Sequence, residues 1–299
     1  MYTACEGPAY ARGRRCHRPP ARPDLPLPRL GSEGPPLLLL HGLASTSHIW
    51  DLTAPLLAER FRVLALDQRG HGESDKPDDG YDFDSFTADV HAFIAALGLQ
   101  RPALVGHSWG GSVALHYAAA HPAVPRALVL VDGGFLEMAS LPGNTWERVE
   151  RELAPPDFTG MTVESLLAFA PRTELGAIWG PEVERAVLAN FYIGEDGSVR
   201  PRLSRDRHMR ILRAIWELKA SELYPRIACP VLMVAAATSA PQGRAADFLA
   251  AKRLGVATAE RLLRRSRTLW LADTIHDVPL QRPRELAEAI VAFLEAEAP

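Results

Sequence analysis

The chain contains 299 residues, of which 47% are hydrophobic and 23% charged, and its formal net charge is −3. This length and apolar content suffice for one large α/β domain with an inserted subdomain. The small net charge provides no overall attraction to nucleic acid or anionic membranes, and every apolar stretch is far shorter than the ~20 residues of a membrane helix. We therefore expect no nucleic-acid partner and no membrane span.

The cysteine pattern and the N-terminal composition bear on location. The three cysteines, at positions 5, 16 and 229, are too few and too scattered for a disulfide framework or a zinc site, which predicts a reducing, cytoplasmic compartment and no metal. Residues 1–29 are rich in arginine and proline, a composition that predicts a disordered or loosely attached arm. A targeting signal is the alternative, although no apolar segment follows Arg14 and Arg15.

From residue 34 onward, short apolar runs alternate with helical patterns, which is typical of a mostly parallel sheet flanked by helices. Strands are expected at 36–40, 61–66, 102–105, 127–131, 230–235 and 268–271, and helices at 86–97, 112–120, 245–263 and 283–296. The interval between the fourth and fifth strands has helical stretches at 163–170, 182–190 and 207–217 but no convincing strand. We therefore expect an α/β core formed by residues 30–134 and 227–299, with a helical cap inserted at 135–226.

A candidate nucleophile lies where the expected third strand turns into the next helix. The sequence there is Gly106-His107-Ser108-Trp109-Gly110. A Gly-x-Ser-x-Gly at such a turn holds the serine hydroxyl away from the sheet, and glycines are needed because a Cβ would collide with neighbouring backbone. A serine that merely caps the helix is the alternative, but capping does not require the flanking glycines.

Four motifs together carry a family resemblance. They are His41-Gly42-Leu43, Asp67-Gln68-Arg69-Gly70-His71-Gly72-Glu73-Ser74, Gly106-His107-Ser108-Trp109-Gly110-Gly111 and Ile275-His276-Asp277-Val278-Pro279-Leu280. In this order the chain resembles the α/β-hydrolase superfamily, in its cap-bearing serine hydrolase branch, over about residues 34–296. The resemblance implies the α/β-hydrolase fold. That family commonly begins with two antiparallel strands where this chain has its Arg/Pro segment, which predicts that these strands are absent and that a sheet edge is exposed or covered by the arm.

Acyl transfer by a serine requires a general base and a group that orients and stabilises the base. His276 is the candidate base, because it follows the last expected strand, where the resemblance puts this residue. In many relatives the acid follows the strand after the cap, but residues 230–240 contain no carboxylate.

Asp132 is the candidate acid. It ends the expected strand at 127–131, and a carboxylate there reaches the same imidazole nitrogen from the adjacent strand. Asp-Gly-Gly is also ordinary turn chemistry, so a turn-capping role for Asp132 stays open. Asp273 and Asp277 compete as acids because they are close to His276 in sequence.

The oxyanion of the reaction needs fixed donors. The expected pair is the backbone N–H of Leu43 and the backbone N–H of Trp109, which directly follows the nucleophile at a helix N-terminus. Among the remaining histidines, His41 and His71 are expected to brace loops. His107 is expected to point to the opposite side of the turn from the nucleophile.

The residue type at the turn also indicates which reactions the site can catalyse. Relatives that open epoxides or displace halide use a carboxylate at this position, so Ser108 argues against both. We expect hydrolysis of a small to medium, mostly apolar carboxylic ester or related acyl substrate through an acyl-enzyme, without a cofactor. The alternatives are a C–C bond hydrolase, and a non-catalytic member of the fold that binds a small hydrophobic ligand.

Overall fold

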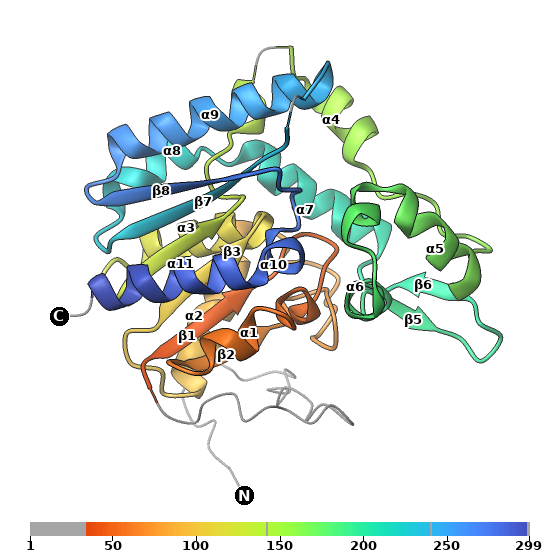
Figure 1. Cartoon of the computed structure of the whole chain (residues 1–299), viewed down its shortest axis with the longest axis horizontal. Coiled ribbons are helices and arrows are strands. Elements are labelled where there is room, and N and C mark those ends of the chain that lie inside the picture. The colour runs from red at the N-terminus through yellow and green to blue at the C-terminus, as the bar shows by residue number, and fades with distance from the viewer. Residues whose placement is uncertain (1–33, 142, 240, 298–299) are drawn as a thin grey trace, which may run out of the picture.

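The structure is a computed structural model that describes residues 34–141, 143–239 and 241–297. The predicted arm at residues 1–29 lies outside the described residues. A six-stranded parallel sheet with the order β2-β1-β3-β4-β7-β8 forms the centre of the molecule (Figure 1). Its strands are β1 (Pro36–Leu40), β2 (Arg62–Leu66), β3 (Ala103–His107), β4 (Ala127–Val131), β7 (Val231–Ala237) and β8 (Ser266–Ala272). The predicted α/β fold with a mostly parallel sheet is therefore confirmed.

Helices cover both faces of the sheet. Successive side chains of a strand point to opposite faces, so Leu38 and Leu40 of β1 join one hydrophobic core and Leu37 and Leu39 the other. The first core includes α2 (Phe83–Ala96), α3 (Trp109–Ala120), α8 (Ala220–Leu223) and α9 (Arg244–Leu262), and the second includes α1 (Ala54–Leu57), α10 (Val278–Gln281) and α11 (Pro283–Ala296). This double burial explains why the strands appear in the sequence as uninterrupted apolar runs.

The predicted elements are present with small differences in their bounds. β1, β4 and α11 have the predicted limits, and the other predicted elements differ by at most three residues at either end. Helix α2 begins earlier than predicted because Asp82 is its N-cap and accepts a hydrogen bond from the N–H of Ser85 at 2.8 Å. Helix α3 begins earlier because it follows Ser108 without any linking residue.

The segment inserted between β4 and β7 contains more than helices. It holds α4 (Trp146–Leu153), α5 (Val163–Phe169), α6 (Pro181–Leu188), α7 (Arg205–Glu217) and an antiparallel hairpin of β5 (Phe191–Ile193) and β6 (Val199–Pro201). The expectation that this segment has no strand is wrong at the hairpin. Its strands have three residues each, too few for an alternating pattern to stand out, and the turn glycines at 194 and 197 were the available signal.

Short 3₁₀ helices complete the fold. They are η1 (Ser47–Trp50), η2 (Met138–Ser140), η3 (Ala170–Arg172), η4 (Glu174–Ile178) and η5 (Tyr224–Arg226). Figure 1 shows α5, α6 and the hairpin lying to one side of the sheet, where they form a small core of their own around Leu166, Phe191 and Val199. Within the described segments we find no helix with the length and apolar character of a membrane span.

Candidate active site

Ser108 lies in the tight turn between β3 and α3, with a φ of +54° that places it in the left-handed region. A Cβ on Gly106 would lie 2.2 Å from the carbonyl oxygen of Gly110, and one on Gly110 would lie 2.5 Å from that of His41. Both glycines are therefore required by the close approach of neighbouring backbone, as the motif predicted. The N–H of Ser108 donates to the carbonyl of Val131 at 2.9 Å, which ties the turn to β4.

His276 lies in the loop between β8 and α10, and its Nε2 is 2.8 Å from the Oγ of Ser108. The loop is fixed by main-chain contacts: the N–H of Val278 donates to the His276 carbonyl at 2.8 Å, and the N–H of Ile275 donates to the Gln281 side chain at 2.6 Å. The His276 side chain is 43% exposed, so the imidazole remains accessible to a reacting molecule.

Asp132 follows β4 and meets the other side of this imidazole. Its Oδ2 accepts a hydrogen bond from the Nδ1 of His276 at 2.7 Å, and its Oδ1 accepts one from the N–H of Ala236 at 2.9 Å. The Asp132 side chain is fully buried. The next residue, Gly133, packs directly on the serine turn, because a Cβ there would lie 2.0 Å from the carbonyl oxygen of Ser108. The structure thus brings Ser108, His276 and Asp132 together.

The electrostatics favour an ionised Asp132. Burial by itself raises the pKa of the Asp132 carboxyl, but the hydrogen bond and charge of His276, with the charge of Lys252, outweigh burial and lower that pKa. Burial lowers the pKa of His276, but the hydrogen bond and charge of Asp132 outweigh it and raise the pKa above its ordinary value. In the part of the chain that the structure describes, neither Asp273 nor Asp277 is hydrogen-bonded to the imidazole.

The two expected oxyanion donors flank the serine turn. Trp109 is the first residue of α3, so its N–H has no acceptor within the helix. On the other side, a Cβ on Gly42 would lie 3.1 Å from the Cβ of Ser108, which places the backbone that precedes Leu43 against the nucleophile. The turn continues through Ala44, which has a φ of +57°.

Two histidines, His41 and His71, connect this turn with the Asp67–Ser74 loop. The N–H of Ala44 donates to the Nε2 of His71 at 3.2 Å, while the Nδ1 of His71 donates to the carbonyl of Arg69 at 2.9 Å. Burial holds the pKa of His71 well below its ordinary value, so the ring stays neutral with Nε2 free to accept. The Nε2 of His41 accepts from the N–H of Gln68 at 2.9 Å.

Sequence reasoning missed His107. The expectation that it points away from the nucleophile overlooked its contact with the His276 loop, where its Nε2 donates to the carbonyl of His276 at 2.9 Å. Burial, with the nearby charge of His276, lowers the pKa of His107 to about 4, so the ring is a neutral donor. No sequence signal indicated this contact, because it depends on how the His276 loop packs against the end of β3.

Lys252 of α9 was also missed. Its Nζ lies 2.7 Å from the Oδ1 of Asp132, and the lysine side chain is only 7% exposed. A lysine in a helical pattern ordinarily lies on the solvent side, so nothing in the sequence distinguished this one.

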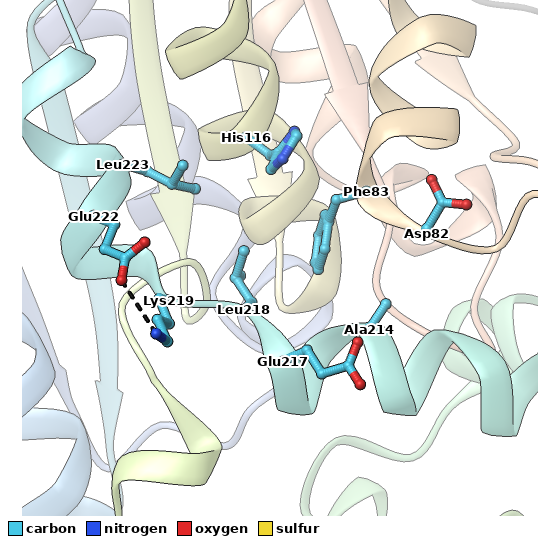
Figure 2. A pocket seen from close by; sticks show the side chains of 9 residues that line it. All are labelled: Asp82, Phe83, His116, Ala214, Glu217, Leu218, Lys219, Glu222 and Leu223. Atoms are coloured by element: carbon cyan, nitrogen blue, oxygen red, sulfur yellow. Dashed lines mark ion pairs between the residues drawn. The ribbon is translucent and has the colours of Figure 1, made fainter.

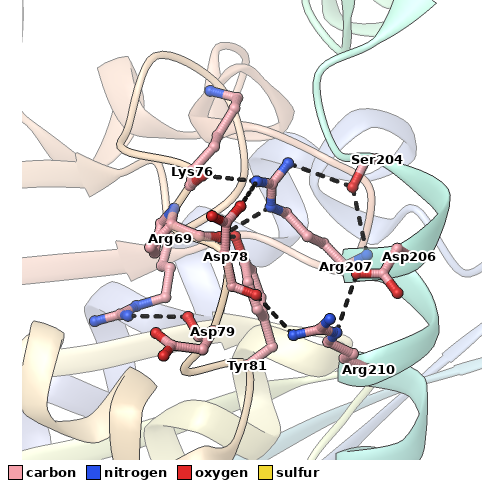
Figure 3. Close-up of polar contacts among 10 residues, drawn as sticks. Arg69, Lys76, Asp78, Asp79, Tyr81, Ser204, Asp206, Arg207 and Arg210 are labelled. Atoms are coloured by element: carbon pink, nitrogen blue, oxygen red, sulfur yellow. Dashed lines mark hydrogen bonds and ion pairs between the residues drawn. The ribbon is translucent and has the colours of Figure 1, made fainter.

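The inserted segment is fastened to the core next to the Asp67–Ser74 motif. Figure 3 shows Arg207 and Arg210 pointing from α7 toward the loop that carries Lys76 and Asp78. Arg207 donates from Nη2 to the carbonyl of Lys76 at 2.8 Å and from Nε to that of Pro77 at 3.0 Å. Arg210 donates from Nη1 to the carbonyl of Asp78 at 2.6 Å. These bonds fix the start of α7 relative to the sheet.

A surface hollow of about 410 Å³ lies elsewhere, between α2, α3 and the α7–α8 segment (Figure 2). Its lining includes Phe83, His116, Leu218 and Leu223, but none of the residues that meet at Ser108. The hollow is therefore separate from the candidate site. Among the described residues, no group of three or more His, Cys, Asp or Glu side chains is arranged to hold a metal ion.

The parallel sheet, the serine at the strand-to-helix turn and the segment inserted after β4 define the architecture of an α/β hydrolase. A family model described as "alpha/beta hydrolase fold" matches residues 35–175. This match, over slightly less than half of the chain, supports the α/β-hydrolase superfamily that the sequence motifs predicted.

Known proteins with similar sequences match about a third of this chain. An uncharacterized protein of Mycobacterium tuberculosis is 38% identical over 106 residues, which are 36% of this chain and 31% of that protein. A soluble epoxide hydrolase of Corynebacterium sp. (strain C12) is 39% identical over 99 residues, covering 33% of this chain and 35% of the relative. The matched region thus spans about a third of the length of these relatives.

Solved structures extend the likeness over most of the chain. The crystal structure of E-2-(acetamidomethylene)succinate hydrolase superimposes with a TM-score of 0.70 at 22% identity, covering 89% of this chain and 93% of that one. At this identity the likeness establishes the fold alone.

Proposed function

We propose that this protein is a serine hydrolase that cleaves a carboxylic ester or related acyl substrate through an acyl-enzyme intermediate. The observation that carries the proposal is the continuous hydrogen-bonded path from nucleophile to acid. It runs from the Oγ of Ser108 to His276 at 2.8 Å and from His276 to Asp132 at 2.7 Å. A half-buried serine next to an imidazole with a buried carboxylate behind it is the arrangement that acyl transfer requires.

In the proposed acylation step, the Nε2 of His276 removes the proton from Ser108 as Oγ attacks the carbonyl carbon of the substrate. Asp132 keeps Nδ1 protonated and stabilises the imidazolium that forms. The backbone N–H groups of Leu43 and Trp109 donate to the oxyanion of the tetrahedral intermediate. Collapse of this intermediate breaks the ester bond, and the leaving alcohol takes the proton from His276.

Deacylation repeats the sequence with water. His276 removes a proton from a water molecule as the water oxygen attacks the acyl carbon. The second tetrahedral intermediate collapses, Ser108 regains its proton from His276, and the carboxylic acid leaves. His107 and His71 support these steps indirectly, since the first holds the His276 loop and the second holds the turn after Leu43.

The nucleophile separates this proposal from the activity of the relative that is an epoxide hydrolase. An epoxide hydrolase forms an alkyl-enzyme ester on a carboxylate, and Ser108 does not provide one. We propose a small to medium, mostly apolar acyl substrate, with residues 135–226 acting as a cap over the site. The bonds from Arg207 to the main chain of residues 76 and 77 support this role, because they hold the inserted segment beside the motif that borders the site.

The test combines labelling with turnover. A fluorophosphonate probe is expected to label the wild type, and p-nitrophenyl esters of graded acyl chain length are expected to be hydrolysed. Ser108→Ala should abolish labelling and lower kcat/KM by about 10³-fold or more. Ser140→Ala, at an exposed serine, is the matched control and should behave as the wild type.

Three results would contradict the proposal. Hydrolysis that persists in Ser108→Ala would remove the serine from the chemistry. A folded wild type that neither labels nor hydrolyses would favour the non-catalytic, ligand-binding alternative. Cleavage of a β-diketone with no turnover of any ester would favour the C–C bond hydrolase.

A further inference from the structure

Lys252 is a buried cation in direct contact with the proposed triad acid. Its Nζ meets three oxygens where β4 and β7 end: Oδ1 of Asp132 at 2.7 Å, Oδ2 of Asp132 at 2.8 Å and the carbonyl of Ala236 at 2.8 Å. It also lies 5.4 Å from the centroid of the Phe248 ring. A buried ammonium is costly unless its donors are satisfied and its charge is neutralised. Both conditions are met here, and both depend on Asp132 being ionised.

The identity of this residue is unusual for the chain. Three of its 33 lysine and arginine residues are lysines, at positions 76, 219 and 252. Arginine is the usual partner in buried ion pairs, because its planar guanidinium donates two parallel hydrogen bonds to a carboxylate. A compact ammonium instead bonds both Asp132 oxygens from one point and leaves Oδ2 open to His276 and Oδ1 open to the N–H of Ala236.

Helix α9 is held at the distance that Lys252 needs. Gly255 lies one turn further along the same helix face, and a Cβ there would lie 1.8 Å from the carbonyl oxygen of Phe135. Val256 and Ala259 of α9 are buried in the sheet core. The backbone of α9 is thus packed directly against the residues that follow Asp132. This packing fixes the position of the Lys252 main chain.

We propose that Lys252 is a positioning residue with two effects: it holds the Asp132 carboxylate ionised and in register between Ala236 and His276, and its own charge lowers the pH at which His276 becomes a free base. This inference rests on the proposed function. It extends the proposed Ser108-His276-Asp132 arrangement by a fourth member that touches neither the nucleophile nor the substrate.

The charges around His276 have opposing effects. Asp132 from β4 and Asp277 at the start of α10 favour the imidazolium, whereas Lys252 from α9 disfavours it. His107 from β3 also faces the ring, with centroids 5.0 Å apart, but stays neutral because its pKa is about 4. Lys252 is thus the cation that opposes protonation of the proposed base.

The size of this effect follows from geometry. The Nζ of Lys252 and the Nδ1 of His276 contact the same oxygen, Oδ2, at 2.8 and 2.7 Å. The two charges therefore lie within about 6 Å, where a unit charge shifts a pKa by about two units at an effective dielectric constant of about 20. Solvent at the exposed side of His276 reduces the shift, so we expect about one unit.

The experiment measures kcat/KM for p-nitrophenyl butyrate against pH in the wild type and in Lys252→Met, Lys252→Gln and Lys252→Arg. Both neutral variants should move the acidic limb of the kcat/KM–pH profile to higher pH by about one unit, because the Lys252 charge no longer disfavours the imidazolium of His276. Lys252→Arg keeps the charge and should keep the limb of the wild type. Lys219→Met, at an exposed lysine, is the control and should leave the profile unchanged.

The possible outcomes are distinct from those that test the proposed function. If the wild type hydrolyses the ester through Ser108 but the neutral variants keep the wild-type limb, the inference about Lys252 is wrong while the serine hydrolase stands. A uniform loss of kcat/KM without a shifted limb would give Lys252 a purely structural role and overturn the inference. Failure of both neutral variants to fold would overturn it in the same way.

Discussion

Asp132→Asn is expected to lower activity and stability for two different reasons, and the structure allows the two to be separated. The substitution keeps the size of the side chain and removes its charge. It affects two cations at once, the imidazolium of His276 that forms during the proposed reaction and the ammonium of Lys252. The first loss concerns the transition state and the second concerns the folded state.

The loss of activity follows from the contact with His276. Charge centres about 4 Å apart at an effective dielectric constant of about 20 interact by about 4 kcal/mol, which corresponds to a rate factor of about 10³. An amide also offers an N–H that competes for Nδ1 and favours the wrong tautomer of the imidazole, and this raises the expected loss toward about 10⁴. Because His276 is 43% exposed, solvent screens part of the charge, so about 10³ is the expected factor.

The loss of stability follows from the contact with Lys252. Its side chain is 7% exposed and would keep one carbonyl partner but no counter-charge. Removing one partner of a buried ion pair typically costs about 3–5 kcal/mol, so the free energy of unfolding should fall by this amount. The double variant Asp132→Asn/Lys252→Met removes the stranded charge and should recover most of the stability while staying inactive.

The assays are urea denaturation for the free energy of unfolding, kcat/KM for p-nitrophenyl butyrate, and the rate of fluorophosphonate labelling. Activity of Asp132→Asn within about ten-fold of the wild type would remove Asp132 from the proposed triad. A double variant as unstable as the single variant would show that the unpaired charge of Lys252 is not the cause of the lost stability. A double variant that regains activity would show that Asp132 matters only as the partner of Lys252.

Two further substitutions test how the site is held. Gly133→Ala should lower fluorophosphonate labelling by about 10²-fold or more, because its Cβ would lie 2.0 Å from the carbonyl oxygen of Ser108 and must displace the turn. The control is Gly180→Ala, whose Cβ would have no neighbour nearer than 3.9 Å. Equal labelling of the two variants would contradict the steric explanation. Arg207→Ala should lower the free energy of unfolding, measured in urea, by about 1–3 kcal/mol and raise KM, because two charge-assisted hydrogen bonds to the main chain are lost. Arg185→Ala, at an exposed arginine, is the control and should change neither quantity. An unchanged KM in Arg207→Ala would contradict a role of the inserted segment in substrate binding.

The parts of the fold that a short stretch of sequence encodes were predictable. Strands β1 and β4 are runs of apolar residues that match their observed limits, because a strand buried on both faces needs no polar residue along its length. The serine turn was predictable for a related reason, since the steric demand of the turn appears in the sequence as glycines at 106 and 110. The β5–β6 hairpin was not, because its strands are too short for any period to be visible.

The candidate site was predictable only in part. Ser108 and His276 follow elements whose order the motifs fixed, and Asp132 was inferred from the lack of a carboxylate at residues 230–240. His107 and Lys252 escaped notice because no motif pairs His107 with the His276 loop or Lys252 with Asp132. Such contacts depend on how α9 and the His276 loop pack, which a single sequence does not encode as a local pattern.

The missing carboxylate after β7 and the buried lysine have a common physical explanation. With the proposed acid directly after β4, Ala236 near the end of β7 contributes main-chain groups: its N–H donates to Asp132 and its carbonyl accepts from Lys252. A carboxylate at position 236 would place a second anion beside Asp132, and two like charges in contact raise the pKa of one of them. A small neutral residue there leaves room for both side chains. If Asp132 is the acid, as we propose, its position after β4 explains why residue 236 is small and uncharged and why a cation from α9 contacts the carboxylate.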